Sequence, residues 1–184
     1  MKKLYLDSLY EYPKKEVYIL ANKLGRRLVD FLGKEIFCLL LDSKILLATF
    51  KIKRLPCFSD DTYKLHAAAK ALEGYLRKVI EGKKLQEFKD DTIGNVFGKK
   101  DKEVRKKIKD KKLIAKTKAV WDFCRNDIMH YSSSQSHQPL EMYDRYKEIV
   151  EIIPLLFKDF YGRTEPDEEI KKNYKKYVRF KRLK

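Results

Sequence analysis

The residue types that could do chemistry gather at Arg125 and His130, which lie five positions apart. An arginine can hold a phosphate with two parallel hydrogen bonds, and a histidine can move a proton near neutral pH. These are the two groups needed to cleave RNA without a metal, because the 2′-hydroxyl of RNA can itself attack the adjacent phosphorus. An Arg–His pair at this spacing also arises by chance in a chain of 184 residues, so its meaning depends on the elements that position it.

The residues between the pair refine this hypothesis. Positions five apart on a regular helix point about 140° away from one another. Arg125 and His130 therefore converge only if the helix loosens after Asn126, or if both border a cleft shared with another subunit. Asn126 precedes His130 by four positions, so its amide can hold the imidazole in one orientation. Asp127 is either a surface acid or a partner of Arg125.

A second polar stripe consists of His66, Lys70, Glu73 and Arg77, at steps of four, three and four residues. One interpretation is a row of ordinary surface ion pairs, each contributing at most a few tenths of a kcal/mol. The other is that Glu73 faces the arginine–histidine pair and sets its orientation and protonation. The spacing alone favours the surface ion pairs, because charged stripes of this kind are common on helices.

Both sets of residues lie in the region 58–162, where apolar residues recur at helical spacing. Long helices are expected over residues 59–81, 113–129 and 138–161, and Pro154 should kink the last one. A glycine- and lysine-rich segment, 82–112, separates the first of these helices from the second. Long helices joined by polar connections predict a mainly α protein with an up-and-down helical bundle.

Residues 1–57 are predicted to form a small α+β unit ahead of this bundle. Apolar residues at helical spacing predict a helix over 17–32, which Gly33 ends. Two apolar, β-prone runs then flank the polar tripeptide Asp42-Ser43-Lys44 and predict a β-hairpin. The candidate strands cover residues 4–12, 36–41 and 45–52.

The remaining residues, 163–184, form a basic tail. From Ile170 to Lys184 there are eight Lys and Arg residues and no acid, with three aromatic residues interleaved. The tail is either a solvated terminal helix whose aromatic side chains face the core, or an arm that follows RNA by base stacking and phosphate contacts. With the polar stripe, it supplies the candidate RNA-binding residues Lys70, Arg77, Lys171, Lys172, Lys175, Lys176 and Arg179.

The composition limits the classes of function. A formal net charge of +16 predicts contact with a polyanion, although a lysine-rich surface can also serve solvation alone. No apolar run approaches the roughly 20 residues of a membrane span, and no signal peptide is evident. The three cysteines are far apart, which argues against a disulfide framework or a zinc knuckle and indicates a reducing cytoplasm. We expect neither a metal site nor a cofactor.

The order of these segments resembles the HEPN superfamily. The resemblance rests on Lys-Ala-Leu-Glu-Gly-Tyr-Leu at 70–76, the basic insert, and Cys-Arg-Asn-Asp-Ile-Met-His at 124–130 before a final long helix. Within that superfamily the chain is most similar to the RNase LS-type toxins of toxin–antitoxin systems, over about residues 60–161. The resemblance implies a helical bundle, a site shared across a homodimer, and the catalytic residues Glu73, Arg125 and His130, with Asn126 as the polar residue after the arginine.

The implied activity is metal-independent endoribonuclease cleavage by a toxin of a toxin–antitoxin or phage-defence system. The 2′-hydroxyl attacks phosphorus and leaves a 2′,3′-cyclic phosphate, His130 transfers protons, and Arg125 offsets charge in the transition state. A dimer would supply two histidines, one as base and one as acid. RNA, a second copy of the chain and a cognate antitoxin are the expected partners.

Three alternatives remain open. A non-catalytic HEPN-type module paired with a nucleotidyltransferase is disfavoured because Ser132 stands where that group has a tyrosine. A CRISPR-associated nuclease that senses cyclic oligoadenylate would need a larger domain ahead of the bundle. A basic RNA-binding helical protein with an accidental Arg–His pair has no catalytic site at all.

Overall fold

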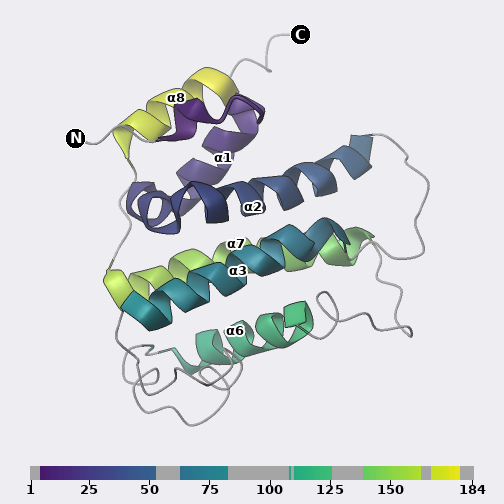
Figure 1. The fold of residues 1–184 in the computed structure, drawn as a ribbon, viewed down its shortest axis with the longest axis vertical. Helices are drawn as coiled ribbons and strands as arrows, with labels where there is room; N and C mark the ends of the chain where they lie inside the picture. Colours follow the sequence, from purple (N-terminus) through teal and green to yellow (C-terminus); the bar gives the residue numbers. More distant parts are fainter. Residues whose placement is uncertain are drawn as a thin grey trace.

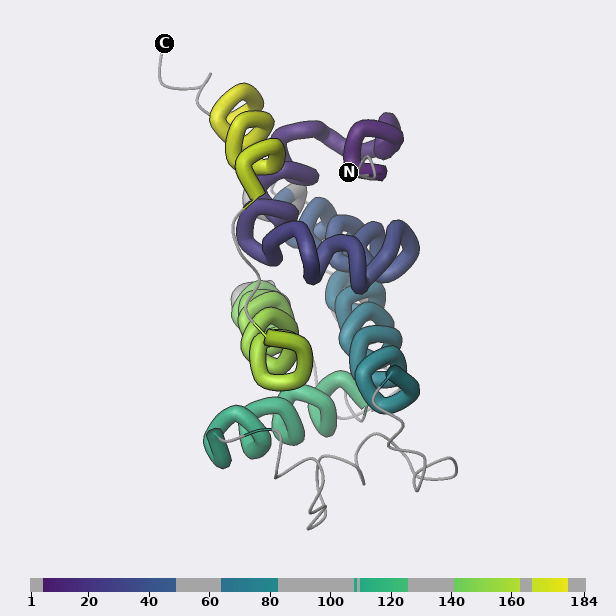
Figure 2. Tube along the Cα trace, turned by 90° about the vertical axis from the view of Figure 1, so that its left-hand side faces the viewer, coloured from purple at the N-terminus to yellow at the C-terminus, as the bar shows by residue number. Residues whose placement is uncertain are grey.

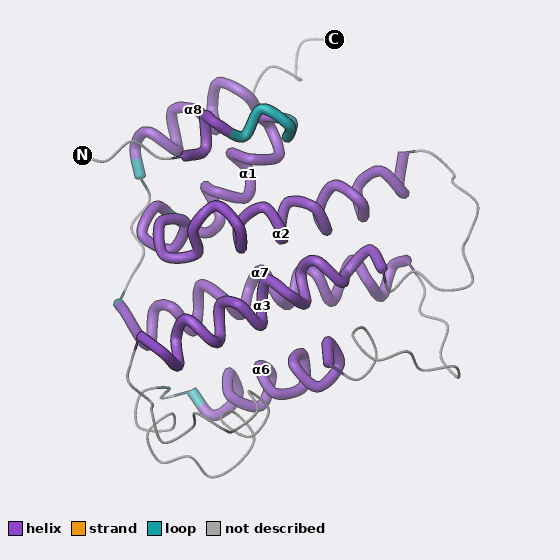
Figure 3. Tube along the Cα trace, viewed as in Figure 1, coloured by secondary structure: helices purple, strands orange, loops and turns teal. Residues whose placement is uncertain are grey.

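The computed structural model describes residues 5–52, 63–82, 108, 110–125, 139–162 and 167–178, and every regular element among them is helical (Figures 1 and 3). The elements are the 3-10 helix η1 (Tyr5–Ser8) and the α-helices α1 (Lys14–Leu24), α2 (Arg26–Ile52), α3 (Tyr63–Gly82), α6 (Lys111–Phe123), α7 (Pro139–Tyr161) and α8 (Glu168–Val178). The prediction of a mainly α protein is confirmed for these residues. Among the helices described, none is both long and apolar enough to cross a bilayer.

The helices are stacked in layers (Figures 1 and 2). Helices α1 and α8 pack against each other at one side of the molecule, and α1 also contacts α2. Helix α2 lies along α3 and α7, which pack side by side in the next layer. Helix α6 packs on α7 at the side opposite α8, so that α2, α3 and α7 separate α6 from α8.

Helices α2, α3, α6 and α7 alternate in direction. A Cβ at Gly74 of α3 would lie 3.2 Å from Cδ1 of Ile36, while Ser43, further along α2, accepts a 2.8 Å hydrogen bond from the backbone NH of Ala68, nearer the start of α3. Helices α2 and α3 are therefore antiparallel and in close contact. A Cβ at Gly82 would lie 2.9 Å from the hydroxyl of Tyr161, so α3 and α7 end at the same side of the bundle and run parallel.

Helices α6 and α7 are antiparallel, as two contacts show. The ammonium of Lys116 lies 3.5 Å from a carboxylate oxygen of Glu151, and the Arg145 guanidinium lies 4.6 Å from the ring centre of Phe123. Moving forward along α6 therefore means moving back along α7. The up-and-down order expected of the bundle is thus present, but α2 is one of its helices.

The predicted β-hairpin is wrong, because both of its apolar runs belong to α2. Apolar residues occur on every side of this helix because it is packed between α1 on one side and α3 and α7 on the other. The polar tripeptide taken for a turn is accommodated within the helix by neighbouring elements. Asp42 accepts a 2.8 Å hydrogen bond from the Tyr12 hydroxyl, Ser43 binds the backbone of α3, and Lys44 forms a 2.9 Å ion pair with Glu16. The candidate strand 4–12 is also wrong where it is described, since Tyr5–Ser8 is η1.

The predicted interruption at Gly33 is present as a break inside α2. Gly33 has φ 74° and ψ 172°, a conformation that residues with a Cβ rarely adopt. The break frees backbone carbonyls of the preceding turn, and the Lys78 ammonium donates to two of them, at 3.1 Å to Phe31 and 2.8 Å to Leu32. Gly25, between α1 and α2, makes a second break that the sequence analysis missed.

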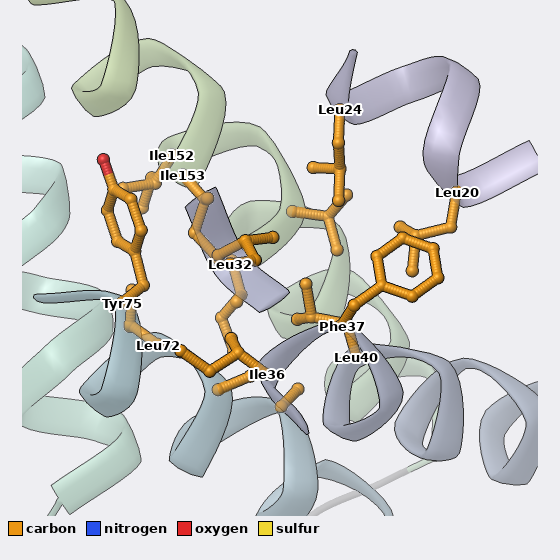
Figure 4. Packing of buried hydrophobic residues seen from close by; sticks show 14 of the residues in the cluster. Leu20, Leu24, Leu32, Ile36, Phe37, Leu40, Leu72, Tyr75, Ile152 and Ile153 are labelled. Atoms are coloured by element: carbon orange, nitrogen blue, oxygen red, sulfur yellow. The ribbon is translucent and has the colours of Figure 1, made fainter. Parts of the chain in front are cut away.

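One hydrophobic cluster runs through the layers (Figure 4). Phe37 of α2 packs toward Leu20 of α1, whereas Ile36 packs toward Leu72 of α3. The apolar stripe predicted for the helix over 59–81 is confirmed, because its residues are all fully buried (Leu65, Ala68, Ala69, Leu72, Leu76 and Val79). The cluster includes residues on both sides of the predicted boundaries at 57 and 162, and these boundaries remain a prediction.

Helix α8 covers α1 with the aromatic side of the predicted basic tail. Tyr177 stacks on Tyr18 with ring centres 5.4 Å apart, and the Asn173 amide donates to the Tyr18 hydroxyl at 3.2 Å. Ile170 is buried beneath the helix. At its start, Asp167 accepts a 3.1 Å hydrogen bond from Arg26. Of the two interpretations of the tail, the described part agrees with the one in which its aromatic side chains face the core.

Candidate functional site

Arg125 lies two residues beyond Phe123, the last residue of α6. Asp110 caps the start of this helix by accepting a 2.8 Å hydrogen bond from the backbone NH of Lys112. After Phe123 the described chain continues with Cys124, which is buried and keeps helical backbone angles, and Arg125, which is exposed. The predicted loosening of the helix after Asn126 lies outside the described residues.

The other residues of the motif lie outside the described part of the chain. This applies to Asn126, Asp127 and His130, and also to Arg179 of the basic tail. Their predicted roles, and the predicted proximity of Arg125 to His130, therefore stay predictions.

Phe123 of α6 contacts α7 through Arg145, and Arg125, two residues later, is exposed. Arg145 has its own acidic partner in Glu148, at 2.9 Å, whereas Arg125 pairs with no other described residue. The candidate partner Asp127 lies outside the described residues.

Glu73 is paired within its own helix. Its carboxylate accepts hydrogen bonds from Nε of Arg77 at 2.9 Å and from the terminal guanidinium nitrogen at 2.7 Å. The Glu73 side chain is 28 % exposed and that of Arg77 is 64 % exposed, so this is the surface ion pair that the spacing favoured. Lys70, one turn earlier, is exposed and has no described partner.

The contacts among α3, α6 and α7 define which residues of α3 and α7 lie at the same position as Arg125 along the helix axes, that is, level with it. Because α6 and α7 are antiparallel with Phe123 beside Arg145, Arg125 lies level with about Tyr143. Because α3 and α7 are parallel with Gly82 beside Tyr161, Tyr143 lies level with about the first turn of α3. Arg125 is therefore level with the start of α3, near Lys64.

Glu73 is about nine residues further along α3, which is about 13 Å of helix rise. A role for Glu73 beside Arg125 remains a prediction, and within one subunit that offset separates the two residues. His66 is the polar residue of the stripe that lies nearest the level of Arg125, about two residues from it. The sequence analysis included His66 in the stripe but gave it no catalytic role, because levels between separate helices cannot be read from spacing along one helix.

The candidate RNA-binding residues of α8 form a separate basic face. Lys172, Lys175 and Lys176 are exposed, and the Lys176 ammonium lies 5.1 Å from the ring centre of Tyr177. Lys171 instead forms a 2.7 Å ion pair with Glu168. Figures 1 and 2 place α8 and α6 at opposite sides of the molecule, so the α8 lysines and Arg125 do not share one local site.

Among the described residues, no group of three His, Cys, Asp or Glu side chains is arranged to hold a metal ion. No protein-family model matches the chain, and neither a curated protein nor a solved structure matches it significantly.

Proposed function

We propose that this protein is a metal-independent endoribonuclease with its catalytic centre at Arg125 and His130. The observation that carries the proposal is the exposed Arg125 side chain, which pairs with no other described residue and follows directly on the end of α6. The proposal assumes that the helix loosens after Asn126, because regular helical spacing would turn the arginine and the histidine of the motif apart. The net charge of +16 supports a polyanionic substrate.

In the proposed reaction the 2′-oxygen of RNA attacks the adjacent phosphorus, and the bond from phosphorus to the 5′-oxygen breaks. His130 accepts the proton of the 2′-hydroxyl as general base. Arg125 binds the non-bridging phosphate oxygens with its planar guanidinium and offsets their growing charge. In the proposed dimer, His130 of the partner subunit gives its proton to the departing 5′-oxygen, so the products are a 2′,3′-cyclic phosphate and a free 5′-hydroxyl.

The proposal includes two RNA-contacting regions that are far apart. Helix axes in contact lie 8–10 Å from each other, so the three layer steps from α8 to α6 amount to about 25–30 Å. A stacked strand advances about 3.4 Å per nucleotide, so one RNA reaching both regions needs about eight nucleotides or more. The α8 lysines then hold the strand while the Arg125 end cleaves it.

The proposal extends to the assembly. Two copies placed with their Arg125 ends facing one cleft form a homodimer of the HEPN kind, in which Glu73 reaches a catalytic centre from the second subunit. A toxin of this kind acts in the cytoplasm under the control of a cognate antitoxin. These features come from the resemblance in the motif and the order of the helices.

The deciding experiment incubates the protein with single-stranded RNA in excess EDTA. The wild type should produce fragments ending in 2′,3′-cyclic phosphate, identified by mass spectrometry. His130→Ala should cleave more slowly by a factor on the order of 10²–10⁴ and still bind RNA. Glu81→Ala, an exposed substitution at the far end of α3, serves as the control for handling and folding.

If His130→Ala cleaves as fast as the wild type, the nuclease proposal is wrong. The second candidate, a basic RNA-binding helical protein, then takes its place. The exposed face of Lys172, Lys175 and Lys176 favours that candidate, because it needs no catalytic centre to bind phosphates.

A further inference from the structure

The two aromatic residues of α8 lie on the side of the helix that packs against the rest of the protein. Ile170, Tyr174 and Tyr177 recur at steps of four and three residues, which places them on one side of a regular helix. Ile170 is buried, and both tyrosines are partly buried against the hydrophobic cluster. The Tyr177 ring stacks on Tyr18 of α1, with ring centres 5.4 Å apart. Both rings are therefore used in packing, whereas stacking on a nucleic-acid base needs an exposed ring face.

The opposite side of α8 carries the three lysines of the basic face. Lys172, Lys175 and Lys176 lie about 140–240° around the helix from Ile170, and all three are exposed. They fall within four residues, or about 6 Å of helix rise, which matches about two nucleotides of a stacked strand and the phosphates that flank them. None of the three forms an ion pair with another described residue.

The acidic residues at the start of α8 are held by other cations. Glu168 forms a 2.7 Å ion pair with Lys171. The Arg26 guanidinium lies 3.1 Å from the Asp167 carboxylate and 3.4 Å from that of Glu169. The rest of the tail contains no acid. Within the described part of the chain, the three charges of the basic face are therefore not neutralised, and they complement a polyanion.

We propose that the basic face of α8 binds the sugar–phosphate backbone of RNA and makes no contact with the bases. The inference rests on the proposed function, because it takes RNA as the ligand, and it states which part of the RNA this helix recognises. A lysine ammonium binds a phosphate as a point charge, so its contacts fix the position of a strand and carry no sequence information. Helix α8 thus holds a strand of any sequence, and the choice of cleavage site belongs to other residues.

The test uses two probes of equal length, about 12 nucleotides, which is enough to reach both RNA-contacting regions. One is an oligothymidylate and the other is an abasic deoxyribose–phosphate chain; neither has the 2′-hydroxyl that the proposed cleavage requires. Affinities are measured by fluorescence anisotropy at about 50 and about 200 mM salt. Over this range the wild type should lose about 20-fold more affinity than the triple variant Lys172→Gln, Lys175→Gln, Lys176→Gln, because each phosphate contact on a single strand contributes about −0.7 to the salt slope. The difference should agree within a few-fold between the two probes.

Two control variants separate this face from net charge and from base stacking. The first removes the same charge from exposed lysines on α1, α2 and α7 (Lys23→Gln, Lys34→Gln, Lys158→Gln) and should retain most of the salt dependence of the wild type. The second, Tyr177→Leu, should weaken binding of both probes by the same factor, whatever its effect on α8 packing. A base stacked on Tyr177 would instead make the loss on oligothymidylate larger by a factor on the order of 10. Circular dichroism confirms that each variant is folded.

The outcomes are distinguishable. Equal effects of the two triple variants would overturn the inference, because binding would then follow net charge and not the basic face. A larger loss on oligothymidylate than on the abasic chain, in either the α8 triple variant or Tyr177→Leu, would also overturn it. The nuclease is judged separately by cleavage of RNA in EDTA. If that cleavage fails while the probes behave as expected, the proposed function is wrong and the basic face remains a backbone-binding surface.

Discussion

Replacing Gly33 with alanine should destabilise the whole protein through its backbone. Gly33 has φ 74° and ψ 172°, in a region that is nearly restricted to glycine. Occupying this region with another residue costs about 1–3 kcal/mol. Among the described residues, a Cβ at this position would meet the Lys78 ammonium at an ordinary contact distance of 3.5 Å, so the cost is conformational strain and not a clash.

The free energy of unfolding of Gly33→Ala, measured by urea titration with circular dichroism, should therefore fall by about 1–3 kcal/mol. For a chain of this size each kcal/mol lowers Tm by about 2–4 °C. Glu35→Ala is the control, because Glu35 is exposed and helical, and it should change stability by less than about 0.5 kcal/mol. A Gly33→Ala protein as stable as the wild type would show that α2 does not require the break.

Three further results are expected. The triple variant Lys172→Gln, Lys175→Gln, Lys176→Gln should keep its Tm. The slope of the logarithm of its RNA affinity against the logarithm of salt concentration, measured by fluorescence anisotropy, should be smaller in magnitude by about 2. An unchanged slope would exclude these lysines from the interface. The same variant should bind a four-nucleotide RNA at the Arg125 end as tightly as the wild type does. The difference in affinity between the variant and the wild type should emerge only when the RNA reaches about eight nucleotides. Partial burial raises the pKa of Asp167, but the NH of Ile170 and the Arg26 guanidinium lower it more, so the pKa lies below its usual value. The ionised Asp167 carboxylate therefore contributes fully to α8 docking above its unfolded pKa of about 4, and this contribution is lost as pH falls through the lower folded pKa. The hydrogen-exchange protection of the α8 backbone amides should therefore drop in acid. The Asp167→Asn variant should lower the same protection at neutral pH.

The sequence predicted helices well where one face is apolar and the other is polar. The stripe of α3 was recognised because its buried residues recur every three or four positions. In α2 this signal disappears, because Phe37 faces one neighbouring layer and Ile36 the other. An apolar run without periodicity is ambiguous between strand and buried helix, and the polar tripeptide then resembled a turn. Its partners Tyr12, Glu16 and the backbone of Ala68 come from other segments of the chain, and no local pattern reveals them.

The candidate site shows the same limit. Spacing placed His66 and Glu73 on one face of a helix and Arg125 at the end of another, and the described residues agree with both statements. Spacing could not say which part of α3 lies beside the end of α6. That relation follows from tertiary contacts such as Gly82 with Tyr161 and Phe123 with Arg145.

The two arginines that begin α2 make α8 separable from the bundle. Arg27 donates a 3.1 Å hydrogen bond to the last carbonyl of α7, at Tyr161, while Arg26 binds Asp167 at the start of α8. The end of α7 and the start of α8 are therefore each bound to the start of α2 by a side-chain hydrogen bond, in addition to the chain that joins them. A protease cut between Gly162 and Asp167 should leave α8 attached, and a synthetic peptide covering 167–178 should restore the basic face to a protein lacking that helix. The basic face of α8 could then be exchanged, or labelled, without altering the helices around Arg125.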